Sequence, residues 1–130
     1  MNKMEIERIT LFEQMGGTPA LHNLVELFYQ HVLADPILKS LFPPDIKPVM
    51  IKQEQFLTQF FGGPPLYTNE YGHPRMRARH LSFPITRERA DAWLACMHKA
   101  LQETIQDVSL REEILERLSI TAYFFVNKEE

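Results

Sequence analysis

The chain has 130 residues, the usual size of one domain, and its 45% hydrophobic and 24% charged residues are ordinary for a globular protein. The net charge of −3 gives no basic field that would favour nucleic acid or a membrane surface. A single cysteine, Cys96, excludes an intrachain disulfide and any Cys-x-x-Cys metal or redox motif. There is no apolar signal region and no run long enough to span a membrane, so we expect one cytoplasmic domain over residues 1–130.

The first third of the chain has helical periodicity and no sustained strand pattern. We predict that residues 1–15 form an N-terminal extension with a short first helix from about Ile6 to Met15, which stops at a Gly-Gly pair. Thr18 and Pro19 are typical of an N-cap and a first helical residue. The helix that follows carries an apolar stripe over residues 21–32 and ends at Asp35, which precedes a proline.

The middle of the chain predicts a second long helix. A short helical turn reaches Phe42, and Asp45 is expected to cap the helix that follows. Its apolar stripe covers residues 49–60, and the Gly-Gly-Pro-Pro sequence at residues 62–65 ends it. We predict an irregular loop over residues 64–73.

The last part of the chain predicts a short helix that ends at His80 and two long helices. Thr86 is expected to cap a helix with an apolar stripe over residues 90–105. Ser109, with a glutamate three residues later, predicts a capping box at the start of the last helix. Four long helices and several short ones predict an all-α domain, either a plain bundle or a sandwich around a cofactor.

His80 is the strongest candidate for a metal ligand. Imidazole is a good axial ligand of haem iron, and His80 lies between Met76 and Phe83, at the end of a short basic helix. None of the five histidines shows His-x-x-x-His or His-Glu-x-x-His spacing, so a zinc site has little support. A single histidine cannot close a zinc site, but it can be the fifth ligand of haem iron.

Three polar or amphipathic side chains, Tyr29, Gln53 and Trp93, lie on the apolar stripes of three different helices. Burying an amide without a partner costs roughly 2–7 kcal/mol, so Gln53 needs a hydrogen bond. Taken singly, each residue has an ordinary explanation in core packing or in a bond to the backbone. Together they can direct hydrogen-bond donors at one point, which favours a buried pocket for a polar ligand.

A basic cluster surrounds the candidate iron ligand in this acidic protein: Arg75, Arg77, Arg79, Arg87 and Arg89. A solvated face is the ordinary interpretation of such a run. The alternative is that arginine forks pair with carboxylates of a ligand, and haem propionates would be such carboxylates.

Several stretches are specific in combination, namely residues 28–29, 52–57, 62–67, 77–80 and 90–94. On these residues the chain resembles the truncated haemoglobins, in particular the second, bacterial-type group. The resemblance runs from Gly16 to Val126. It implies a two-over-two helical sandwich around a non-covalently bound haem b.

The resemblance also implies a role for each candidate residue. His80 would be the proximal iron ligand, and Arg79 and Tyr67 would reach the haem propionates. Tyr29, Gln53 and Trp93 would form a distal hydrogen-bonding set. The remaining haem contacts would be Phe42, Val49, Phe56, Met76 and Phe83. Val49 stands at the gate where globins often carry histidine, so no histidine-gated entry is expected.

The resemblance implies a haem protein that binds oxygen, carbon monoxide and nitric oxide at a five-coordinate iron. Donors directed at the ligand would make oxygen release slow, which suits a sensor, scavenger or catalyst better than oxygen transport. The alternative is an enzyme for nitric oxide dioxygenation or peroxidase-like chemistry, which would need a separate reductase because this chain has no flavin or nicotinamide domain. A helical interaction module without haem is a third option. A monomer and a homodimer both remain open.

Overall fold

The computed structural model describes residues 9–74 and 85–128. Within them every regular element is helical, which confirms the predicted all-α class. Several sequence-based assignments lie outside the described residues, namely the short helix that ends at His80 and the roles of Arg75, Met76, Arg77, Arg79, His80 and Phe83. The elements are α2 (Leu11–Met15), α3 (Gly17–Ala34), the 3-10 helix η1 (Lys39–Leu41), α4 (Lys47–Phe60), α5 (Leu66–Tyr71), α7 (Arg87–Thr104) and α8 (Val108–Phe124).

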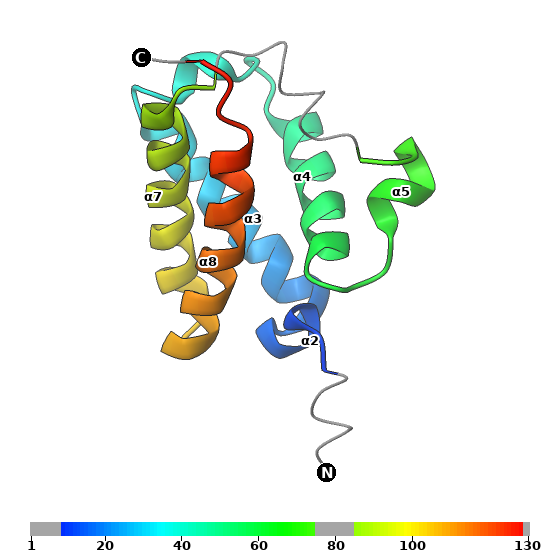
Figure 1. Cartoon of the computed structure of the whole chain (residues 1–130). Helices are drawn as coiled ribbons and strands as arrows, with labels where there is room; N and C mark the ends of the chain where they lie inside the picture. The colour runs from blue at the N-terminus through cyan, green and yellow to red at the C-terminus, as the bar shows by residue number, and fades with distance from the viewer. Residues whose placement is uncertain (1–8, 75–84, 129–130) are drawn as a thin grey trace.

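The helix α3 is the centre of the arrangement. It packs against α7 and α4, while α7 also packs against α8 and α4 against α5. Figure 1 shows α7 and α8 side by side on one side of α3, with α4 and then α5 on the other. None of the described helices has both the length and the apolar character that crossing a membrane requires.

The start of α3 differs from the prediction. The N-cap is Gly16 and not Thr18, and the helix begins at Gly17. Gly16 also ends α2, in a left-handed conformation with φ of 113° that lets two helices join without a loop. The predicted start of the first helix near residue 6 was also too early, because Thr10 is its N-cap and accepts a hydrogen bond from the Glu13 amide.

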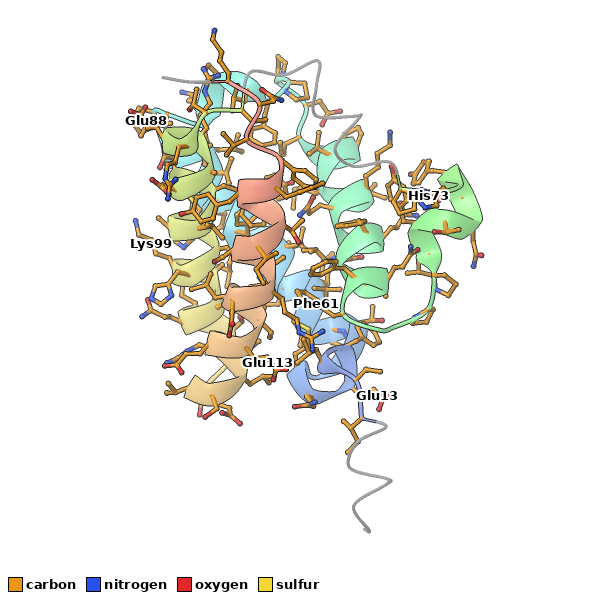
Figure 2. All side chains as sticks on the ribbon, in the orientation of Figure 1. Glu13, Phe61, His73, Glu88, Lys99 and Glu113 are labelled. Atoms are coloured by element: carbon orange, nitrogen blue, oxygen red, sulfur yellow. The ribbon has the colours of Figure 1, made fainter. Side chains whose placement is uncertain are left out.

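The helix α4 begins at Lys47, and the preceding Ile46 makes no side-chain cap. Asp45 nevertheless acts on the first turn, because its Oδ1 accepts a hydrogen bond from the Lys47 amide at 3.2 Å. At the other end Phe61 is buried, and its carbonyl accepts a bond from the Phe12 amide at 2.9 Å, which ties α2 to α4. Figure 2 shows Phe61 inside the molecule, whereas Lys99 of α7 lies on the outside.

The loop predicted over residues 64–73 was wrong, because α5 occupies Leu66–Tyr71. Six residues are too few for a stable isolated helix, so tertiary contacts must hold this one. The Gln59 side chain of α4 supplies two of them. Its Oε1 accepts from the Thr68 amide at 3.0 Å, and its Nε2 donates to the Thr68 hydroxyl at 2.8 Å.

Of the caps predicted for the last two helices, one is confirmed and one is wrong. Thr86 caps α7 as predicted, because its hydroxyl accepts from the Arg89 amide at 3.1 Å. The capping box at Ser109 was wrong: Asp107 is the N-cap of α8, and its carboxylate accepts from the Leu110 amide at 3.2 Å. A carboxylate two residues earlier is the better acceptor at a helix N-terminus, where the dipole favours negative charge.

Candidate functional site

A cavity of about 410 Å³ lies among α3, α4, α7 and α8. This volume falls within the range of roughly 300–1,000 Å³ that is typical of small-molecule sites. Most of its lining is aliphatic or aromatic, and the larger apolar residues are Leu38, Leu41, Phe42, Val49, Phe56, Leu57, Ile85, Leu118 and Phe125.

Tyr29, Gln53 and Trp93 all line this cavity, each from a different helix. Tyr29 of α3 is 3% exposed, and burial raises the pKa of its hydroxyl above the usual range. The hydroxyl therefore stays protonated at neutral pH and can donate a hydrogen bond. Gln53 of α4 and Trp93 of α7 are half-buried and also carry N–H donors. The structure thus brings the three predicted side chains to one space, and their role toward a ligand stays a prediction.

Aromatic packing holds two of these side chains. The Phe28 ring lies edge-to-face against Tyr29 with centroids 4.9 Å apart, and against Trp93 at 5.0 Å. Tyr29 also meets Phe42 edge-to-face at 5.8 Å. Perpendicular ring contacts of this kind restrict how far either ring can rotate.

Four of the predicted haem contacts also line the cavity: Phe42, Val49, Phe56 and Tyr67. Tyr67 comes from α5 and is 3% exposed, and its ring packs edge-to-face on Phe56 at 5.9 Å. The unpredicted helix α5 is therefore part of the site, because it carries Tyr67 to the cavity.

Two cationic residues, Lys52 of α4 and Arg89 of α7, also line the cavity. Arg89 belongs to the basic cluster found in the sequence, but sequence reasoning missed Lys52. Its Nζ lies 5.0 Å from the centroid of the Tyr71 ring. The sequence did contain a signal for Lys52. The spacing 0, 3, 4 and 7 places residues on one helix face, and it is the spacing of Val49, Lys52, Gln53 and Phe56.

The C-terminal end of the described chain fixes another part of the cavity wall. The Asn127 amide donates to the Ile85 carbonyl at 3.0 Å, and the Ile85 amide donates to Asn127 Oδ1 at 3.0 Å. Ile85 lines the cavity directly before α7. Sequence reasoning missed this pair, since no local motif links residues 42 positions apart.

Cys96 takes no part in the cavity and is buried in the core. Burial is the main cause that raises the pKa of its thiol. A thiol in this state is a poor nucleophile, and Cys96 packs in the core as a small apolar residue.

A helical sandwich around an apolar cavity, with polar side chains entering from three helices, is the architecture of a small globin. The family model of the bacterial-like globins matches residues 10–127. The group 2 truncated haemoglobin YjbI of Bacillus subtilis is 52% identical over 114 residues, which are 88% of this chain and 86% of that protein.

Solved structures give the same result. The crystal structure of the group II truncated haemoglobin from Bacillus anthracis matches with a TM-score of 0.91 and 48% identity over 94% of this chain and 99% of that one. The structure described as a truncated oxygen-avid haemoglobin from Bacillus subtilis has a TM-score of 0.87 and 50% identity, over 91% and 99%. The chain belongs to the bacterial-like globins, as a group II truncated haemoglobin with the two-on-two fold. Membership of this family implies a haem group and diatomic gas ligands.

Proposed function

We propose that the chain binds haem b non-covalently in this cavity, with His80 as the proximal iron ligand, and that it holds oxygen with slow release. The observation that carries the proposal is the convergence of Tyr29, Gln53 and Trp93 on one apolar cavity. Bound haem would supply an iron centre that takes oxygen, carbon monoxide or nitric oxide.

The lining of the cavity fits a flat apolar group that carries carboxylates. The Phe42 and Phe56 rings offer apolar surface on the α3 and α4 sides. Lys52 and Arg89 place cationic groups on α4 and α7, where they would pair with propionates. Lys52 is exposed, so its pairing would contribute only about 0–1 kcal/mol to haem retention.

The polar side chains would act as donors toward a diatomic ligand. Tyr29 would donate its hydroxyl proton, Trp93 its indole N–H and Gln53 a side-chain N–H. A hydrogen bond to a charged acceptor contributes about 1.5–3 kcal/mol, which is roughly a ten- to a hundredfold factor in release rate. Low exposure at Tyr29 would also limit competition from water. The similarity to a Bacillus subtilis protein described as oxygen-avid supports this proposal.

The iron ligand is tested by replacing histidines. We expect His80→Ala to lose tight haem binding or to change the ferrous five-coordinate spectrum, measured on purified protein. His98→Ala is the matched control, because His98 is exposed on the outer part of α7. A His80→Ala protein with normal haem content and a normal spectrum would remove His80 from the proposal.

The donors are tested by rapid mixing. Tyr29→Phe removes only a hydroxyl, and Trp93→Phe removes the indole N–H while it keeps an aromatic ring. Each change is expected to raise the oxygen dissociation rate by roughly ten- to a hundredfold. The double variant is expected to depart from the product of the single effects, because groups in one network are coupled. Carbon monoxide release is expected to change less. Oxygen release at the wild-type rate in both single variants would contradict the proposal.

A further inference from the structure

Phe28 contacts the rings of both aromatic donors and does not line the cavity itself. It is fully buried in α3, with 0% of its surface exposed. Tyr29 is its neighbour in sequence, and Trp93 reaches it from α7. One buried side chain therefore contacts both donors without lining the cavity.

The contacts form a continuous series of rings from α7 across α3 to the corner before α4. Trp93 meets Phe28 at an interplanar angle of 64°, and Phe28 meets Tyr29 at 75°. Tyr29 then meets Phe42 at 84°. In an edge-to-face pair, rotation of one ring drives its edge into the other, so each contact fixes two ring planes together.

The Phe28 ring is itself closely packed. It lies on the face of α3 that packs against α7, where Met97 and Leu101 are also fully buried. Protein interiors of this density leave little space for a ring to change its rotamer. A fixed ring that contacts two donors sets the directions in which they point.

We propose that Phe28 is a positioning residue that orients Tyr29 and Trp93 together and couples their effects on a bound ligand. This inference rests on the proposed function of the two donors. A residue that only fills the core would change the free energy of unfolding and leave the ligand chemistry untouched. A positioning residue changes both.

The first experiment compares oxygen release in two core variants. Phe28→Leu keeps an apolar side chain and removes the ring. Leu21→Ala is the matched control, because Leu21 is also fully buried in α3 but lies two turns away. We expect Phe28→Leu to speed oxygen release by roughly 2- to 10-fold, the factor that one edge-to-face ring pair represents. Leu21→Ala is expected to release oxygen at the wild-type rate, although it is also less stable.

A second readout follows the tryptophan directly. Trp93 is the single tryptophan of the chain, so a fluorotryptophan label gives one fluorine resonance that reports on this residue. In the carbon monoxide-saturated ferrous protein we expect Phe28→Leu to shift or broaden this resonance and Leu21→Ala to leave it unchanged. In a Tyr29→Phe/Trp93→Phe background, Phe28→Leu is expected to add no further change in oxygen release.

The results separate the inference from the proposed function. If Tyr29→Phe and Trp93→Phe leave oxygen release unchanged, the proposed donor function fails, and the resonance still reports whether Phe28 orients Trp93. If Phe28→Leu has the wild-type release rate, or Leu21→Ala changes the rate equally, Phe28 is a core residue and the inference is wrong. Should Phe28→Leu fail to fold, Phe28→Met keeps more side-chain volume and undergoes the same measurements.

Discussion

Two walls of the cavity are built differently. The wall from α3 and α7 is backed by fully buried apolar side chains that do not line the cavity themselves, such as Phe28, Met97 and Leu101. In the second wall, polar groups on the outer side join α4 to α5. Gln59 of α4 makes two hydrogen bonds with Thr68 of α5. Gln55 Nε2 also donates to Glu70 at 2.6 Å, and Lys52 lies over Tyr71.

The two walls therefore differ in how their side chains are held: the first by buried apolar contacts, the second by exposed hydrogen bonds. A buried apolar group is held by many contacts at once, so a change there affects the whole fold. An exposed hydrogen bond exchanges with water and contributes about 0.5–1.5 kcal/mol, so its loss loosens one segment. The proposed donors Tyr29 and Trp93 lie on the first wall, where orientation matters. Tyr67, from the short helix α5, stands on the second.

The largest expected effect is on the apolar wall. Leu101→Ala removes a fully buried side chain from the face of α7 that meets α3, and it is expected to lower the free energy of unfolding by about 2–5 kcal/mol. Urea denaturation measures this change. Ile120→Ala is the control, since Ile120 is 69% exposed on α8, and it is expected to stay within about 0.5 kcal/mol of wild type. Equal losses in the two variants would contradict the account of the apolar wall.

A smaller and more local effect is expected on the polar wall. Gln59→Ala removes both bonds to Thr68, one of which satisfies an amide in the first turn of α5. We expect hydrogen exchange in α5 to speed up by roughly tenfold, while the global free energy of unfolding changes by less than about 1 kcal/mol.

Gln59→Glu is the matched variant for this bond. Its carboxylate keeps an acceptor for the Thr68 amide, and the Thr68 hydroxyl can donate to the second oxygen. Exchange in α5 is therefore expected to remain near the wild-type rate. If Gln59→Ala destabilised the whole protein as much as Leu101→Ala, the two walls would not differ in the way described.

A contrast of this kind also explains which elements could be predicted from the sequence: long, regular helices could, and a short helix held by a distant residue could not. The buried stripe of α3 and the Thr86 cap of α7 were found because long helices repeat their apolar spacing and caps are local. The helix α5 was missed because six residues carry no period and its support comes from Gln59 on another helix. The error at Ser109 arose because Asp107, two residues earlier, is also a good cap, and only the path of the chain decides between the two.

The residues of the candidate site also differ in whether they could be predicted from the sequence. Tyr29, Gln53 and Trp93 could be predicted to share a cavity because a polar group on an apolar stripe requires an explanation, and each lay on a long helix. Lys52 was missed because a lysine next to such a stripe has the ordinary interpretation of a solvated residue. The Ile85–Asn127 pair could not be predicted, since it depends on the path that the chain takes after the end of α8.

The smallest expected effect concerns the bridge that joins the two walls at the surface. His22 of α3 lies between two glutamates: its Nδ1 is 2.6 Å from Glu54 of α4, and its Nε2 is 3.0 Å from Glu26. The hydrogen bond to Glu54 is the main cause that raises the pKa of His22 above its ordinary value of 6.5, and the charge of Glu54 adds to it. The folded state therefore binds the His22 proton more tightly than the unfolded state does.

A raised histidine pKa gives stability that is complete below the ordinary value of 6.5 and disappears as the pH rises through the folded-state value. His22→Gln, which cannot become charged, is expected to have a lower Tm than wild type at about pH 5.5 and the same Tm at about pH 8.5. The gap at low pH should shrink with added salt, because His22 is exposed. His98→Gln, on the outer part of α7, is the control for losing a histidine. A gap of equal size at both pH values would show that the charge of His22 does not contribute to joining α3 and α4, and that the two walls are held together by their apolar contacts alone.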